Sequence, residues 1–241
     1  SAILGPCAAL LALSSVLVLR CLLFADGGLL ALGCNIFNMA VLSCLAAYPL
    51  VYRPIAGRST SPGRIFAASL AASVAGLELG ALAVTAETVA SGITALPFGR
   101  FLLFMLPIHL AIGIGEGIAT GTVLCAVQRY RPELLAGRRN EKQTGKTLAA
   151  IALASLVVGG SFSWIASSRP DGLEWSIERT AADPEIEAQP DGAHRTAAAL
   201  QQRTAALPDY DTSAAGLVGC GVILLAAWGG TRLLRTRRRQ A

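Results

Sequence analysis

Long apolar runs alternate with short polar or basic connections along the whole chain. One helical crossing of a bilayer core about 30 Å thick requires roughly 20 apolar residues. Most of the runs are rich in Ala, Gly and Ser, which let membrane helices pack closely. The pattern therefore predicts an all-α fold, a polytopic transmembrane helical bundle of about six spans. We place these spans at residues 3–24, 29–52, 65–90, 101–128, 147–166 and 214–233.

Basic residues gather in alternate connections between these spans. Most of the Arg and Lys residues lie in 53–64, in 129–146 and in the tail after 231, whereas 167–213 holds nine acidic residues against four arginines. Because short cytoplasmic loops are enriched in Lys and Arg, we predict that the three basic segments and the carboxyl terminus are cytoplasmic. The segment 167–213 becomes an external loop of a protein in the inner (plasma) membrane. No aromatic residues are interleaved with the basic ones, so the net charge of +5 reports topology and not nucleic-acid binding.

The composition shifts divide the chain into two membrane parts. Residues 1–130 form the first, 131–146 form a basic cytoplasmic linker, and 147–241 form the second, with two helices around the loop 167–213. Inside that loop a Pro-Asp-Gly turn precedes Leu173, Trp175 and Ile177, which alternate with polar residues, and a short helix is predicted over 193–206. No Gly-rich phosphate loop occurs in the sequence, so this chain is not expected to hydrolyse ATP by itself.

The amino-terminal residues and the cysteines add two further expectations. The sequence begins with Ser1 and reaches a Gly5-Pro6 pair at once, without a charged region or a cleavage site, so it is no signal peptide and resembles the interior of a longer protein. Six cysteines fall within the predicted spans, and none forms a CxxC pair. We predict that they are buried free thiols rather than disulfide or zinc ligands. They are Cys7, Cys21, Cys34, Cys44, Cys125 and Cys220.

Polar side chains inside membrane spans are functional candidates, because burying them in hydrocarbon is costly. Asn35 and Asn38 are three residues apart and therefore share one helix face. They would either bond to a neighbouring helix or line a polar cavity. Asp26 precedes Gly27-Gly28 at an external turn. It would cap the next helix, or otherwise face incoming cations.

Ionisable groups occur in the other spans. His109 and Glu116 lie on one side of a helix about 10 Å apart, too far to bind one metal ion together. We expect a hydrogen bond from His109 to a backbone carbonyl, and a buried Glu116 at a close helix contact or beside a partner's donor. Glu78, near a span centre, needs a partner or a proton and could relay protons. We expect Glu87 to be hydrated near the external end, and Arg20 to reach outward.

Two pairs of segments resemble known families. The segments LLFADGGLLALGCNIFNMA (22–40) and LPIHLAIGIGEGI (106–118) closely resemble the CbiM/NikM family, the membrane-embedded substrate-capture subunits of energy-coupling-factor transporters for cobalt and nickel. The segments PDGLEWSIE (170–178) and LPDYD (207–211) resemble the PDGLE domain, which is the CbiN/NikN small subunit. The order is that of a fusion of the two subunits.

The resemblance implies a function in the uptake of cobalt or nickel ions. The implied partners are a transmembrane coupling subunit and cytoplasmic ATPase subunits of an ABC-type transporter. The ion is cargo, no cofactor is permanently bound, and no enzymatic activity is implied. Asn35 and Asn38 match the family's GANxFNM element, with Cys34 where the family usually has a small residue. The candidates for lining the metal pathway are Asp26, Asn35, Asn38, His109 and Glu116.

The sequence departs from the family at its start. Family members begin with a Met-His-Ile element that supplies nitrogen ligands, and a further ligand histidine lies in an early GTSGH-like segment; neither is present in these 241 residues. We therefore expect a chain that lacks the first family helices and the principal metal ligands. Another possibility is a metal-sensing or assembly membrane protein without transport activity. An intramembrane enzyme would need an acid-base pair within hydrogen-bond reach, and no convincing pair is present.

Overall fold

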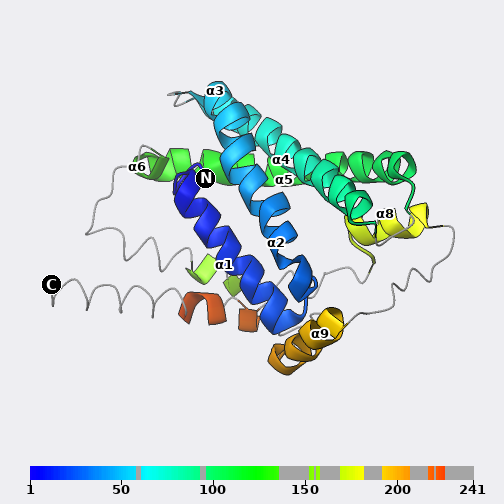
Figure 1. Cartoon of the computed structure of the whole chain (residues 1–241). Helices are drawn as coiled ribbons and strands as arrows, with labels where there is room; N and C mark the ends of the chain where they lie inside the picture. Colours follow the sequence, from blue (N-terminus) through cyan, green and yellow to red (C-terminus); the bar gives the residue numbers. More distant parts are fainter. Residues whose placement is uncertain are drawn as a thin grey trace.

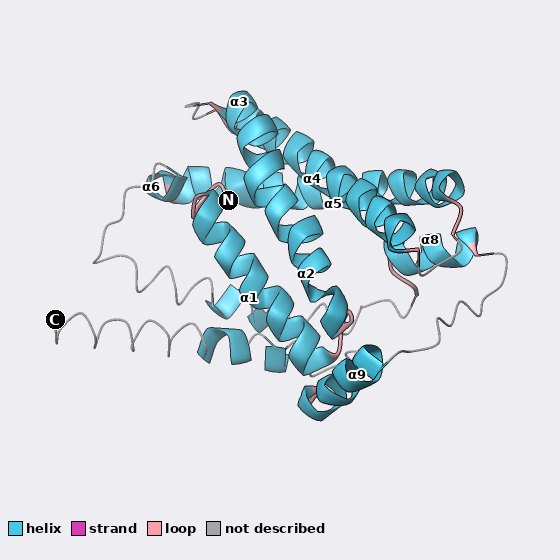
Figure 2. Cartoon of the chain, in the orientation of Figure 1, coloured by secondary structure: helices cyan, strands magenta, loops and turns pink. Residues whose placement is uncertain are grey.

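The computed structural model is built of helices packed side by side (Figures 1 and 2). It describes residues 1–57, 61–92, 96–135, 152–154, 156–157, 169–181, 192–206, 217–219 and 221–225. Within these ranges the structure contains helices and loops but no strand, in agreement with the predicted all-α fold.

Four stretches are long and apolar enough to cross a membrane, namely Pro6–Phe24, Leu29–Ala56, Pro62–Ser91 and Phe98–Tyr130. They correspond to the first four predicted spans. The predicted spans 147–166 and 214–233 lie largely outside the described residues. Of these two spans the structure describes helical residues at 152–154, 156–157, 217–219 and 221–225, so the total of six remains a prediction.

The first span is α1, Pro6–Phe24, and the second is a succession of helical turns. The second consists of η1 (Leu29–Ala31), α2 (Leu32–Asn35), η2 (Ile36–Tyr52) and α3 (Arg53–Ala56). In η2 the hydrogen bonds follow the wider π pattern, which is rare and is associated with functional sites. The third and fourth spans are α4 (Pro62–Ser91) and α5 (Phe98–Tyr130), followed by α6 (Pro132–Leu135).

Proline and glycine set the helix boundaries. Pro6 and Pro62 stand at the first turns of α1 and α4, where the missing N–H costs nothing and the fixed φ favours a helix. Gly92 ends α4 in the left-handed conformation, at φ 66°. These signals explain why the observed ends lie within a few residues of the predicted ones.

A seam of glycines joins α4 and α5. A Cβ atom built on Gly113 would lie 3.0 Å from the Cα of Val74, and one on Gly117 would lie 2.8 Å from the Cα of Leu70. Backbones can approach so closely only where side chains are absent, as is common between membrane helices. The two pairs show that the helices are antiparallel, and the same register brings position 109 level with position 78.

Two further helices come from the predicted external loop. They are α8, Gly172–Thr180, and α9, Gly192–Thr204. The predicted helix over 193–206 is confirmed. Both lie at the end of the bundle where α1 and α4 finish, which we call the α8–α9 end (Figure 1).

The opposite end, which we call the basic end, carries the start of α1, the turn between α3 and α4, and α6 (Figure 1). Arg64 donates to the carbonyl of Ile55 from Nε at 3.1 Å and from Nη2 at 2.9 Å, and so closes the turn between α3 and α4. Arg53, Arg64, Arg129 and Arg131 thus lie away from α8 and α9, whereas Arg20, Arg179 and Arg203 lie at the α8–α9 end. The orientation of the bundle in the membrane stays a prediction.

Candidate functional site

The connection between α1 and α2 has a backbone fixed by two residues with positive φ. Ala25 adopts φ 55° and Gly27 adopts φ 76°, and a non-glycine residue in this region is uncommon. Arg20 donates to the Asp26 carboxylate, with Nε 2.9 Å from Oδ2, and forms an ion pair with it. The following helices η1 and α2 have no side-chain cap. The predicted capping role of Asp26 is therefore wrong, because Arg20 engages its carboxylate instead.

Asn35 and Asn38 do not act as one amide pair. Asn35 ends α2, and its Nδ2 lies 2.8 Å from the position of a Cβ on Gly27, against the connection just described. Asn38 lies in η2 and faces α4. The wider π turn begins at Ile36 and changes the angle between residues three apart. The predicted common face is therefore divided between two neighbours.

Asn38 forms an interhelix hydrogen bond, with Nδ2 donating to Oε2 of Glu87 at 2.8 Å. Glu87, predicted to be hydrated, is in fact half-buried between the helices. The approach is close, since a Cβ on Gly80 would lie 3.0 Å from the Asn38 carbonyl oxygen. The amide oxygen Oδ1 of Asn38 is buried and has no hydrogen-bond partner among the described residues.

The cysteines differ in exposure. Cys21 and Cys44 are buried, as predicted, whereas Cys7 and Cys34 are exposed, contrary to the prediction. Cys125 is partly exposed, and Cys220 lies outside the residues that the structure describes.

His109 lies where α4, α5 and α8 meet. Its Nδ1 is 2.8 Å from the carbonyl oxygen of Met105, as predicted. A carbonyl can only accept, so Nδ1 carries a hydrogen and donates it. On α8, a Cβ added to Gly172 would lie 3.3 Å from Cε1 and 3.6 Å from Nε2 of His109. Glu78 lies level with His109 in the register of α4 and α5, and its Oε1 has no hydrogen-bond partner in the described ranges.

Glu116 is exposed, although the sequence predicted a buried carboxylate. Gly113 and Gly117 face α4, so the close helix contact is made by the glycines, and Glu116 projects from another side of α5.

The helix α8 begins with a capping box. The Asp171 carboxylate accepts hydrogen bonds from the backbone N–H groups of Leu173, at 2.8 Å, and Glu174, at 2.9 Å. The Glu174 carboxylate accepts in return from the Asp171 N–H at 3.3 Å. The alternating pattern that we noted over 173–177 therefore belongs to a helix, and the D-x-x-E spacing was the signal for it.

One face of α8 packs on α4 and α5. Leu173 and Ile177, four residues apart, contact a buried cluster formed by Ala81, Leu96, Phe101 and Met105. The Trp175 ring meets the Phe104 ring edge to face at 5.8 Å. The predicted external loop is thus anchored to α4 and α5.

The helix α9 is attached to the α1–α2 connection through Gln201, a residue that the sequence analysis did not single out. Its side chain is only 8% exposed, and Nε2 donates to the carbonyl oxygens of Gly27 at 2.7 Å and Cys21 at 3.1 Å. A polar residue in a polar segment gives no sequence signal for such a contact.

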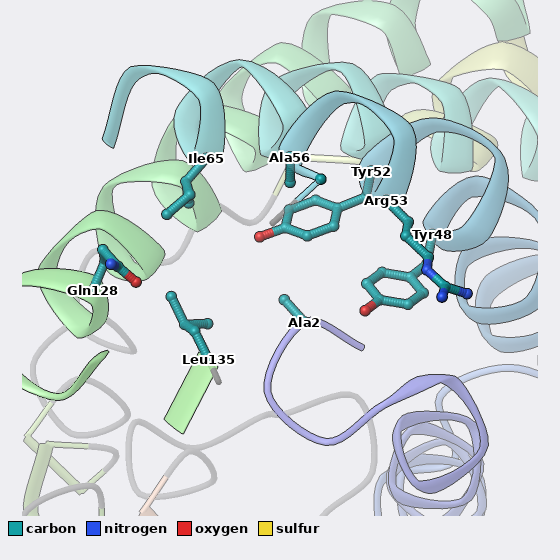
Figure 3. A pocket seen from close by; sticks show the side chains of 9 residues that line it. Ala2, Tyr48, Tyr52, Arg53, Ala56, Ile65, Gln128 and Leu135 are labelled. Atoms are coloured by element: carbon teal, nitrogen blue, oxygen red, sulfur yellow. The ribbon is translucent and has the colours of Figure 1, made fainter. Parts of the chain in front are cut away.

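A pocket lies at the basic end (Figure 3). It is lined by the stacked rings of Tyr48 and Tyr52, with Arg53, Gln128 and Leu135 nearby. No lining residue carries a carboxylate or an imidazole, so this pocket offers no set of metal ligands. Across the described ranges, no three His, Cys, Asp or Glu side chains converge on one point.

Comparisons with known proteins identify two regions. The family model described as "Cobalt uptake substrate-specific transmembrane region" (CbiM) matches residues 1–134, and the PDGLE domain model matches residues 145–236. The "Putative fused nickel transport protein NikMN" of Archaeoglobus fulgidus is 30% identical over 97% of this chain and 75% of its own length. The "Fused nickel transport protein NikMN" of Rhodobacter capsulatus is 33% identical over 73% of this chain and 54% of its own length.

A third relative carries a cobalt name. The "Cobalt transport protein CbiM" of Desulforamulus reducens is 30% identical over 54% of this chain and 52% of its own length. This chain thus spans about half the length of several curated relatives. No solved structure matches it.

Proposed function

Since the chain belongs to the CbiM family of cobalt uptake substrate-specific transmembrane regions and carries a PDGLE domain after it, we propose that it captures cobalt or nickel ions for uptake through an energy-coupling-factor transporter. Relatives with the same two-part order are named as nickel transport proteins. The family is one of membrane transport proteins and not of enzymes.

The observation that carries the proposal is the attachment of the two parts to each other. The ring of Trp175 on α8 packs against Phe104 on α5, and Gln201 on α9 bonds to the carbonyl of Gly27. Both contacts lie at the α8–α9 end, beside the group formed by Asn38 and Glu87. The PDGLE part is therefore in a position to load an ion into the helical bundle.

The division of labour follows from this arrangement. Residues 1–130 take up the ion, 131–146 link the parts in the cytoplasm, and 147–241 assist loading from outside. The α8–α9 end faces the exterior of the plasma membrane, and the basic end and carboxyl terminus face the cytoplasm. There the transmembrane coupling subunit and the ATPase subunits bind, and the ATPases supply the energy.

Asp26, Asn35, Asn38 and His109 lie at or near the α8–α9 end, as residues that line a pathway from that side would. Glu116 lies further along α5 and is exposed, so a contribution from it requires a neighbour beyond the described helices. Among these candidates, Asn38 has the strongest support, because it is buried and its acceptor oxygen has no partner among the described residues.

The test is metal accumulation by cells. Cells without a nickel or cobalt importer would receive the complete gene together with the other transporter subunits, and radioactive nickel and cobalt would be counted after short incubation. Accumulation above that of cells without the gene supports the proposal. A metal-sensing or assembly protein, the alternative function, would give no accumulation.

A further inference from the structure

The pocket at the basic end is lined by side chains from three parts of the chain. Tyr48, Tyr52 and Arg53 come from the second span, Gln128 comes from α5, and Leu135 comes from α6. The pocket has a volume of about 110 Å³, which is several times what one water molecule requires. It therefore has room for a group of several heavy atoms, such as a phosphate.

Polar side chains around this pocket carry hydrogen-bond donors that the protein does not use. Two phenol hydroxyls, one guanidinium group and one amide form no hydrogen bond or ion pair with the described part of the chain. They belong to Tyr48, Tyr52, Arg53 and Gln128. Figure 3 shows both tyrosine hydroxyls directed into the pocket, with the Arg53 guanidinium at its edge beside Tyr48. All four groups can donate to one ligand, and the guanidinium is permanently charged.

The charges around the pocket favour an anion. None of the lining side chains is acidic. Of the neighbouring arginines, Arg64 donates to the carbonyl of Ile55, and Arg131 pairs with the carboxylate of Glu133. The guanidinium of Arg53 thus remains available for a ligand. Phosphate suits this combination, because a guanidinium group can bind two of its oxygens through parallel charge-assisted hydrogen bonds.

The position along the helices indicates where the phosphate comes from. Tyr48 and Tyr52 lie in the last turns of the apolar stretch Leu29–Ala56, and Gln128 lies in the last turn of Phe98–Tyr130. Tyrosine is enriched at the level of the lipid head groups, where its ring is in an apolar layer and its hydroxyl in a polar one. Basic pockets between membrane helices at this level bind the head groups of anionic lipids.

We propose that this pocket binds the phosphate group of an anionic phospholipid from the surrounding membrane. The guanidinium of Arg53 receives the phosphate oxygens, and the Tyr52 hydroxyl and the Gln128 amide donate to them. Because these side chains come from α3, η2 and α5, a bound lipid joins the second and fourth spans at the basic end. The site does not involve the transported ion, so it is independent of the proposed function.

Native mass spectrometry of the purified full-length protein in detergent tests this site. The protein would receive either dioleoyl phosphatidylglycerol, which is anionic, or dioleoyl phosphatidylcholine, which has the same chains and no net charge. Phosphatidylglycerol should be retained preferentially, and Arg53→Gln should weaken its retention on the order of tenfold. Tyr52→Phe should weaken it by a smaller factor, since a neutral donor is lost.

The matched control is Arg129→Gln, which removes a positive charge at the same end but outside the pocket. This variant should retain phosphatidylglycerol as the wild type does. Equal retention of both lipids by the wild type overturns the proposal. Equal losses in Arg53→Gln and Arg129→Gln overturn it too, because attraction to the general positive charge of this end would then account for the binding.

A second measurement uses the wild-type protein alone. A phosphatidylglycerol with a photoreactive head group would be cross-linked to the full-length protein in phosphatidylcholine vesicles, and mass spectrometry would locate the labelled peptides. The label should gather at residues 48–57 and 128–135, and unlabelled phosphatidylglycerol should displace it. Displacement by soluble glycerol phosphate at the same concentration would indicate a site for free phosphates and overturn the lipid assignment. Absence of label at these residues, expected if a helix of another protein fills the pocket, overturns it as well.

Discussion

The glycine seam between α4 and α5 gives a sharp prediction about stability. In Gly117→Ala the new Cβ would lie 2.8 Å from the Cα and 3.2 Å from the carbonyl oxygen of Leu70. Carbon atoms pack best at about 3.5–4.0 Å, so the helices must move apart by roughly 1 Å. Gly115→Ala is the matched control, because its Cβ would meet nothing within 4 Å.

The difference in stability between the two variants separates the effect of the clash from the effect of replacing glycine by alanine. Alanine is favoured over glycine in a helix by about 1 kcal/mol, and this gain is common to both substitutions. Overpacking costs about 1–3 kcal/mol. Gly117→Ala should therefore be less stable than Gly115→Ala by about 1–3 kcal/mol, which corresponds to melting temperatures roughly 2–12 °C apart.

The assay is thermal unfolding of the purified protein in detergent, followed by tryptophan fluorescence. Gly121→Ala should fall between the other two variants, because its Cβ would meet the Phe66 ring, 2.7 Å away, and a side chain moves more easily than a backbone. If Gly117→Ala melts within about 1 °C of Gly115→Ala, the close packing derived for α4 and α5 is refuted.

Three other predictions concern α9, α8 and the turn between α5 and α6. Gln201→Ala removes the bonds to Gly27 and Cys21 and should destabilise the attachment of α9 by about 1–3 kcal/mol. Faster proteolysis after α9 and slower metal uptake should report this loss, and Gln202→Ala, at an exposed position, should match the wild type. Asp171→Ala removes the cap of α8 and should destabilise this helix by about 1 kcal/mol. Amide hydrogen exchange at the first turn of α8 should then be faster, and unchanged exchange would contradict the capping box. Arg131 holds the pKa of Glu133 below its usual range through a hydrogen bond. The stabilising effect of this partly buried pair is therefore present at neutral pH and lost as pH falls through the lowered pKa. An NMR titration should find the Glu133 pKa raised in Arg131→Gln, and an unchanged value would rule out the pairing.

The positions of the first four spans could be predicted because bilayer thickness sets their length and because Pro6, Pro62 and Gly92 mark helix ends. The tertiary contacts of the polar residues could not be predicted. Asn38 and Glu87 are 49 residues apart in the chain, and their pairing depends on the register in which η2 meets α4. That register follows from close contacts such as Gly80 against Asn38, which no periodicity reveals.

Local patterns did not predict two features. The alternation at 173–177 gave no indication of a helix, although Leu173 and Ile177 also have the four-residue spacing of one helix face, and Asp171 with Glu174 is the stronger signal. The prediction that Asn35 and Asn38 share one face required an ordinary α turn, and the π turn that begins between them gives the two side chains different partners.

The central claim is that this membrane protein captures cobalt or nickel for uptake driven by ATP. The most direct measurement compares the accumulation of radioactive cobalt and nickel in two sets of cells, which express the complete gene with either intact or catalytically inactive ATPase subunits. We predict accumulation of at least one of the two ions with the intact ATPase and background levels with the inactive one. Background levels of both ions in both sets, or equal accumulation in both, would contradict it.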